Sequence, residues 1–272
     1  MTDLEMFMMM AQSVPQNRAE EDYVQDGLLY CHKCHTPKQY RMVQPIEDGE
    51  IFTMVLPVSC KCMKEEAERE KRQKEIVAQR NDCFHGFCSY EHFTFADDRG
   101  SKSISDGLRA YAGSFDRQLR DGTGVILSGA VGTGKTFYAA CIANEVVRAG
   151  YTAKIINLSS VINADFKDRA QYIAGFDDYD LLIIDDIGVE RNTDAANEVV
   201  YAVINNRYCL CKPMIVTTNV RFSEMKQCKD IARQRIYDRI IERCYPINLG
   251  EESKRKAIAK QLYMSNRDIF GG

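Results

Sequence analysis

Several features that would place a protein in a membrane, in a secretory pathway or on a nucleic-acid surface are missing from this sequence of 272 residues. No apolar run approaches the roughly 18 residues of a membrane-spanning helix, so no membrane partner is predicted. Residues 1–16 are rich in Met but carry no basic cluster. Because a secretory signal needs such a cluster, we expect a cytoplasmic protein. The net charge of −3 means that binding to nucleic acid would need a local basic surface.

Cysteine is abundant, with 11 residues. In a chain of this length without a secretory signal, reduced thiols or a metal site are expected rather than disulfides. Two close pairs stand out, C-x2-C at Cys31 and Cys34 and C-x-C at Cys60 and Cys62. Two such arms suit tetrahedral Zn²⁺ held by four thiolates. The second arm is one residue shorter than usual, so two alternatives stay open: His32 or His35 replaces one thiolate, or the thiols are free and buried.

Changes in composition along the chain predict two parts. Residues 28–62 combine the cysteine pattern with three prolines, which is typical of short strands and turns. Residues 63–80 are almost entirely strong helix formers of both charge signs and predict a solvated linker helix. We therefore expect an N-terminal module over residues 1–92 and a second domain over residues 93–272.

Beyond about residue 96, apolar runs typical of strands alternate with helical periods. Strands that are apolar on both faces and alternate with helices predict an α/β fold, in which helices cover both faces of a parallel sheet. Gly150 lies where the first long helix should end. The expected strands are Val125–Leu127, Lys154–Leu158, Leu181–Ile184, Met214–Thr217 and Tyr245–Leu249, and the expected helices cover residues 135–149, 159–172, 194–208 and 230–243.

The first expected strand leads into a motif that fits G-x-x-x-x-G-K-[ST] at every fixed position. Glycines let backbone N–H groups turn onto phosphate oxygens, and the N-terminus of the next helix adds positive potential. Lys135 is placed to bridge the β- and γ-phosphates of a nucleotide, and Thr136 offers a hydroxyl to Mg²⁺. The phosphate-binding residues are Gly129, Ala130, Val131, Gly132, Thr133, Gly134, Lys135 and Thr136.

Two later strands also end in polar side chains. Asp185 and Asp186 follow the apolar run that starts at Leu181, and Asn219 follows the run that starts at Met214. Acids at the carboxyl end of a buried parallel strand lie beside the phosphate loop. We expect Asp185 to hold Mg²⁺ through water, Asp186 to orient or deprotonate the attacking water, and Asn219 to position that water. A turn or helix-cap role is the alternative for Asn219.

These residues resemble the DnaC/DnaI/IstB group of AAA+ ATPases. Besides the phosphate loop, the similar segments are LLIIDDIG at 181–188, ERNTDAANEVVYAVINNRY at 190–208 and KPMIVTTN at 212–219. The run INNRY at 204–208 is similar to this group and not to AAA+ proteins in general. The resemblance implies a P-loop AAA+ core of five parallel strands in the order 5-1-4-3-2. It also implies hydrolysis of ATP bound between neighbouring subunits, in DNA replication or transposition.

Within this group, helicase loaders deliver a hexameric replicative helicase onto single-stranded DNA, and IstB-type proteins assist a transposase. The cysteine cluster is of the sort seen in bacterial and phage loaders, which favours a loader. A transposition helper, and a nucleotide-switched adaptor with incidental turnover, are the alternatives. The resemblance also implies that the N-terminal module binds the helicase, that the ATPase domain self-associates, and that its helical lid is reduced. It makes Arg239 the best candidate for an arginine finger and Arg235 the second.

Overall fold

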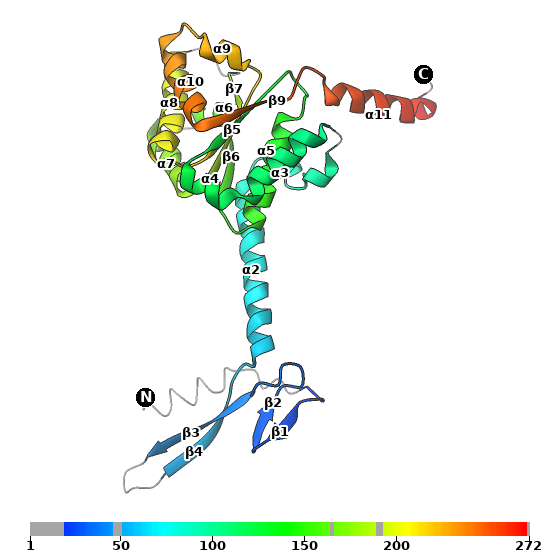
Figure 1. Cartoon of the computed structure of the whole chain (residues 1–272), viewed down its shortest axis with the longest axis vertical. Coiled ribbons are helices and arrows are strands. Elements are labelled where there is room, and N and C mark those ends of the chain that lie inside the picture. Colours follow the sequence, from blue (N-terminus) through cyan, green and yellow to red (C-terminus); the bar gives the residue numbers. More distant parts are fainter. Residues whose placement is uncertain (1–18, 46–50, 99, 164–165, 189–192, 271–272) are drawn as a thin grey trace. The chain divides into compact units, whose positions relative to one another are not determined.

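The computed structural model describes residues 19–45, 51–98, 100–163, 166–188 and 193–270 (Figure 1). Contacts divide the chain into two compact units, Met1–Glu75 and Ile76–Gly272. This boundary lies earlier than the expected one at residue 92, because Cys83 and Phe84 are buried in the core of the second unit. Within the described ranges, no helix is long and apolar enough to cross a membrane.

The described part of the first unit contains two small antiparallel hairpins. Asp26 and Gly27 connect the strands of the first hairpin, and both have positive φ, 51° and 74°. An Asp-Gly pair with two positive φ values suits the tight turn that matches the twist of a hairpin. The hairpins pair β1 (Tyr23–Gln25) with β2 (Leu28–Tyr30) and β3 (Gln39–Pro45) with β4 (Ile51–Pro57).

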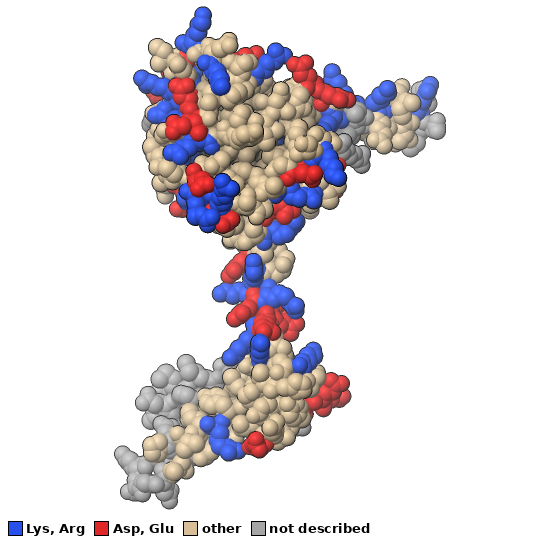
Figure 2. Space-filling model, in the orientation of Figure 1, with Lys and Arg blue, Asp and Glu red and all other residues tan. Residues whose placement is uncertain are grey.

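Helix α2 (Lys61–Cys83) follows, where the sequence predicts a helix over residues 63–80. Basic and acidic side chains alternate over its surface (Figure 2). Lys61 pairs with Glu65 at 3.8 Å and Lys71 with Glu75 at 3.9 Å, both one turn apart. Such pairs support a helix that has few apolar side chains to bury.

The second unit contains a five-stranded parallel sheet, as predicted. Its strands are β5 (Gly124–Ser128), β6 (Ala153–Asn157), β7 (Leu181–Ile187), β8 (Met214–Thr218) and β9 (Cys244–Asn248), and they lie in the order β6-β7-β8-β5-β9. The labels differ from the predicted numbering because four hairpin strands precede the sheet. With β5 counted as the first strand, the order from the β9 edge reads 5-1-4-3-2.

Helices cover both faces of this sheet and create two apolar cores (Figure 1). The first core includes side chains of α3 (Lys102–Gly113) and α5 (Lys135–Arg148), and the second includes side chains of α8 (Asp194–Cys209) and α10 (Ile231–Arg243). Strand β5, which lies between β8 and β9, is buried along its whole length. These two covered faces explain why the strands are apolar throughout instead of alternating with polar residues.

The helix ends follow local chemistry. Gly150, with φ of 98°, follows α5 in the left-handed conformation that glycine adopts readily. The side chains of Thr193 and Asp230 accept backbone N–H groups at the starts of α8 and α10. The helix expected over residues 159–172 is instead two helices, α6 (Leu158–Ile162) and α7 (Phe166–Ala174), and residues 164–165 lie outside the described ranges.

Short elements complete the unit. The further helices are α4 (Phe115–Asp121), α9 (Phe222–Lys226) and α11 (Lys254–Phe270), and the single 3₁₀ turns are η1 (Cys88–Tyr90), η2 (Phe95–Asp97) and η3 (Gly175–Asp178).

Candidate functional site

The carboxyl ends of three neighbouring strands bring the predicted nucleotide-site residues to one edge of the sheet. The phosphate loop follows β5, and Asp185 and Asp186 lie in β7. Strand β8 pairs with both of these strands and therefore separates them. A polar side chain near the end of β8 can thus reach the acids, and Thr217 does so.

In the phosphate loop, Gly132 and Gly134 have φ of 86° and 100°. A side chain at Gly132 would also meet the hydroxyl of Ser253 at 2.3 Å. The buried Lys135 donates from Nζ to the carbonyl oxygens of Gly129 at 2.9 Å and Ala130 at 2.8 Å. Burial lowers the pKa of Lys135, and the charges of Asp186 and Asp185 oppose that effect. The loop therefore folds around the ammonium group of Lys135, which the motif predicts to bind the phosphates.

The residues suited to Mg²⁺ are joined directly. Thr136 Oγ1 donates to the Asp185 carboxylate at 3.0 Å, and Thr217 Oγ1 donates to the same carboxylate at 2.7 Å. Burial raises the pKa of Asp185, the charge of Asp186 raises it further, and the Thr217 hydroxyl opposes the shift. A buried carboxylate beside a hydroxyl is a hard oxygen ligand set, which fits Mg²⁺. Sequence reasoning missed Thr217, although its signal is a polar residue inside an apolar strand.

Asp186 lies in an irregular part of β7. The pairing of β7 with β8 shifts between Ile184 and Ile187, and Asp186 has φ of 57°. Its backbone N–H donates to Thr217 Oγ1 at 2.8 Å, which anchors the bend. Bulges of this kind redirect a side chain near a functional site. The two neighbouring acids therefore occupy different surroundings: Asp185 is buried and Asp186 is partly exposed.

Asn219 directly follows β8 and is exposed at the same edge of the sheet. Arg239 lies elsewhere, on α10, where its guanidinium contacts side chains of α8. The phosphate loop, Asp185, Asp186 and Asn219 therefore lie at one edge of the sheet. Arg239 does not lie with them.

A C-terminal segment lies on the phosphate loop. Ala130 N donates to Gly250 O at 3.1 Å, and Lys254 N donates to Gly132 O at 2.8 Å. Lys254 Nζ lies 3.2 Å from Asp98 Oδ1 and 3.3 Å from the hydroxyl of Tyr138. These contacts join residues up to 156 positions apart. Local sequence patterns therefore do not predict them.

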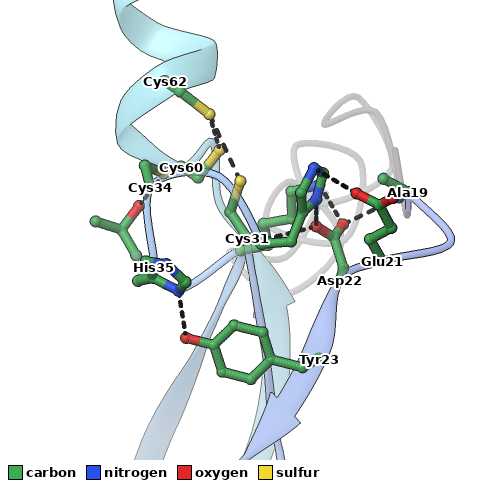
Figure 3. Close-up of polar contacts among 12 residues, drawn as sticks. Ala19, Glu21, Asp22, Tyr23, Cys31, Cys34, His35, Cys60 and Cys62 are labelled. Carbon is green, nitrogen blue, oxygen red and sulfur yellow. Dashed lines mark hydrogen bonds and ion pairs between the residues drawn. The ribbon is translucent and has the colours of Figure 1, made fainter.

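In the first unit, the four predicted cysteines converge (Figure 3). Their sulfur atoms all lie within 4.8 Å of one another. Cys62 Sγ lies 3.5 Å from Cys31 Sγ and 3.4 Å from Cys60 Sγ. Four thiolates at about 2.3 Å from one Zn²⁺ would place their sulfurs about 3.8 Å apart in a tetrahedron. The cluster therefore fits a four-thiolate zinc site.

The local backbone explains the spacing of the two arms. Cys31 and Cys34 lie in a tight turn in which His35 N donates to Cys31 O at 2.9 Å. Cys60 and Cys62 instead lie at the start of α2, where Lys64 N donates to Cys60 O. A helix start replaces the second tight turn, which accounts for C-x-C in place of C-x2-C. It also adds positive potential beside the thiols.

The pKa values of the cysteine thiols in the cluster also bear on metal binding. Hydrogen bonding from the Thr36 hydroxyl lowers the pKa of Cys34 to about 5. The hydrogen bond between Cys62 and Cys60 raises the pKa of Cys62 to about 12. Hydrogen bonds thus favour ionisation of Cys34 and oppose ionisation of Cys62. Because cysteines bind a metal ion as thiolates, zinc binding would release the protons that remain.

The two histidines considered as alternative ligands have other partners. His35 Nδ1 pairs with the hydroxyl of Tyr23 at 3.1 Å (Figure 3). His32 pairs through Nδ1 with Asp22 at 3.1 Å and through Nε2 with Glu21 at 3.2 Å. His32 and Asp22 do lie near Cys31, in a second group of possible ligands. The four sulfurs nevertheless form a complete set without either ring.

A parallel sheet in this order has a phosphate loop after β5 and a buried acid near the end of β7, one strand away. This arrangement defines a P-loop ATP-binding protein of the AAA+ class. The sequence profile described as IstB-like ATP binding protein matches residues 56–261. The chain therefore belongs to that family.

Similar proteins include replication and insertion-sequence proteins. The replicative helicase loader DnaC of Escherichia coli K12 is 27% identical over 64% of this chain and 72% of its own length. A putative ATP-binding protein in an insertion sequence of Mycobacterium tuberculosis is 32% identical over 38% of this chain and 43% of its own. A crystal structure of DnaI covers 59% of this chain and 92% of that chain, with 20% identity and a TM-score of 0.50. The predicted resemblance to the DnaC/DnaI/IstB group is confirmed.

Proposed function

We propose that this protein is an ATP-dependent helicase loader, which binds single-stranded DNA and delivers a hexameric replicative helicase onto it. In this proposal ATP is hydrolysed to ADP and phosphate in the second unit. Lys135 binds the phosphates, Thr136 and Asp185 hold Mg²⁺, Asp186 and Asn219 act on the attacking water, and Arg239 acts on the nucleotide of a neighbouring chain. The first unit binds zinc and the helicase.

The ATPase part of the proposal is supported by the Thr136–Asp185–Thr217 cluster. Bound Mg²⁺ would supply charge stabilisation for the phosphates as they react. Thr217 holds Asp185 in place, and the bend in β7 separates the buried acid from the partly exposed Asp186. One acid is thus suited to the cation and the other to a water molecule.

The choice of a loader over a transposition helper is carried by the four-cysteine cluster. The family match begins at residue 56, so the first hairpin, strand β3 and the tight turn with Cys31 and Cys34 lie outside it, whereas Cys60 and Cys62 lie inside it. A module added before the ATPase unit is suited to a partner of its own. The similarity to an insertion-sequence protein supports the alternative, and its alignment spans less of this chain than that with DnaC does.

A binding experiment separates these two functions. The full chain is presented in turn with a purified replicative helicase and with an IS21-type transposase, both from the bacterium that carries this gene. The proposal predicts a stable complex with the helicase that the Cys31→Ser/Cys34→Ser variant does not form. A complex with the transposase alone would replace the loader by the transposition helper.

A further inference from the structure

The INNRY run at residues 204–208, singled out by its resemblance to one group of ATPases, has no described contact with the residues of the nucleotide site. Ile204 is buried in the second core. Asn205 and Tyr208 instead face Arg239 on α10. Helices α8 and α10 pack together, so the run forms part of a surface that holds an arginine.

The guanidinium of Arg239 is fixed at all three nitrogens. Nε donates to Asn205 Oδ1 at 3.0 Å, and one terminal nitrogen donates to the Tyr201 hydroxyl at 2.9 Å. The other terminal nitrogen donates to the carbonyl of Arg235, one turn earlier, at 3.0 Å. Three hydrogen bonds leave this planar group little freedom to rotate.

Aromatic rings add a second constraint. The guanidinium carbon lies 4.8 Å from the ring centre of Tyr201 and 5.5 Å from that of Tyr208. The hydroxyl of Tyr208 bonds to Glu242 at 2.9 Å, which fixes that ring in turn. Cations over aromatic faces are attracted electrostatically. The two rings and Asn205 therefore form a platform for Arg239.

The contacts of this platform do not use all the N–H groups of Arg239. A guanidinium has five N–H groups, and three are bonded to residues that the structure describes. One N–H on each terminal nitrogen is left over, and the side chain is partly exposed. Two N–H groups on adjacent nitrogens are the fork that binds two phosphate oxygens together. No carboxylate takes up this fork among the described contacts.

We propose that Tyr201 and Asn205 are positioning residues, which hold Arg239 so that its two remaining N–H groups meet the phosphates of ATP bound by a neighbouring chain. The inference rests on the proposed ATPase function. Holding the guanidinium in advance avoids an ordering cost in the transition state, where the arginine acts. Tyr201 and Asn205 themselves touch no nucleotide.

The test measures ATP hydrolysis by the full chain with Asn205→Ala or Tyr201→Phe. Tyr201→Phe removes one hydrogen bond and keeps the ring. A displaced catalytic group costs on the order of 10²-fold in rate, so kcat should fall by about 10- to 100-fold while KM stays unchanged. Asn206→Ala, at the adjacent asparagine of the same helix, is the matched control and should keep the wild-type kcat. Equal kcat for Asn205→Ala and Asn206→Ala would overturn the inference.

Mixing variants shows whether the defect acts between chains. A Lys135→Ala chain has a damaged phosphate loop but an intact Arg239 and platform. When Asn205→Ala chains are mixed with Lys135→Ala chains, activity should return. The nucleotide sites of the Asn205→Ala chains are then completed by the correctly held Arg239 of a Lys135→Ala neighbour. A general folding defect would not be rescued in this way. Failure of rescue, with both variants folded, would contradict a platform that serves a neighbour.

A second readout is independent of turnover. The hydrogen-bonded Nε–H of Arg239 should give a slowly exchanging ¹⁵N–¹H signal that Asn205→Ala removes and Asn206→Ala retains. If wild-type protein binds ATP without hydrolysing it, the proposed ATPase function fails, and the inference fails with it. If Arg239→Ala abolishes turnover while Asn205→Ala and Tyr201→Phe do not affect it, the inference alone fails.

Discussion

At the scale of single residues, Thr217 connects the two acids of the nucleotide site. Its hydroxyl donates to Asp185 and accepts the backbone N–H of Asp186. The side chain is fully buried, so these bonds have no water to replace them. One hydroxyl thereby fixes both the carboxylate assigned to Mg²⁺ and the bend that exposes the next acid.

Thr217→Val keeps the shape of this side chain and removes both bonds. Leaving buried polar groups unpaired costs about 1–3 kcal/mol of unfolding free energy. Loss of a group that orients a metal ligand typically costs about 10- to 100-fold in metal affinity. Thr218→Val is the control, because the buried Thr218 hydroxyl bonds to Ile187 O instead. Both variants should lose stability in thermal unfolding, and only Thr217→Val should need more Mg²⁺ for ATP binding. Equal Mg²⁺ dependence would contradict the role of Thr217.

The residues that could be predicted are those whose chemistry fixes their type and spacing. Lys135, Thr136 and Asp185 lie where the motifs place them, because a phosphate loop and a buried strand end leave few options. Thr217 and Lys254 escaped prediction because neither is a fixed position of these motifs: Thr217 bonds to Asp185, 32 positions away, and Lys254 contacts Asp98, 156 positions away.

At the scale of elements, Arg207 fastens α8 to the segments around it. Its guanidinium is buried and donates to the carbonyls of Tyr179, Asp180 and Pro213 at 2.7–2.9 Å. Burial lowers the pKa of Arg207 to about 10, so the group keeps its charge at neutral pH. The bonds join α8 to the segment before β7 and to the segment before β8. Periodicity predicted the helix but assigned no role to this charge.

Arg207→Ala should strongly destabilise the second unit. Each buried carbonyl left unpaired costs about 1–3 kcal/mol, so we expect a loss of about 3 kcal/mol or more. The measurement is the unfolding free energy from denaturant titration. Arg120→Ala removes an exposed arginine that pairs with Asp116 one turn away, and it should change stability by no more than about 0.5 kcal/mol. A similarly small effect of Arg207→Ala would show that these bonds are not needed.

Another element-level prediction concerns the start of α2. The purified protein should hold one Zn²⁺ per chain, because thiolates from a tight turn and from this helix start share one centre. The Cys31→Ser/Cys34→Ser variant should lose the metal and the folded hairpins, since metal binding supplies folding free energy in small modules. Cys209→Ser/Cys211→Ser changes two exposed cysteines outside the cluster and is the matched control. Mass spectrometry of the native protein measures the metal, and a metal-free wild type would contradict the assignment.

At the scale of the whole molecule, contacts divide the chain after Glu75, whereas composition predicted a division after residue 92. Composition marks the charged helix as a linker, whereas its last turn carries Cys83, which is buried in the core of the second unit. Helical sequence alone does not show which turns pack against a core. Since the phosphate loop and the contacts described for it lie in the second unit, nucleotide binding should not depend on the first.

Because of this independence, we expect each of two variants to lose one binding property and to keep the other. Lys135→Ala removes the phosphate-binding ammonium and should abolish ATP binding while zinc content stays at the wild-type value. Cys31→Ser/Cys34→Ser should lose zinc and bind ATP normally. Nucleotide titration and metal analysis of the same preparations give both values. Loss of ATP binding in the cysteine variant would show that the two units act as one.

The central claim, that the protein loads a helicase, is tested most directly on circular single-stranded DNA, which offers no end for a ring to thread. The measurement is displacement of an annealed strand by the replicative helicase, with this protein and ATP present. The account predicts unwinding that needs the wild-type chain and that fails with Lys135→Ala or with Cys31→Ser/Cys34→Ser. Unwinding at the same rate with and without the protein would contradict it.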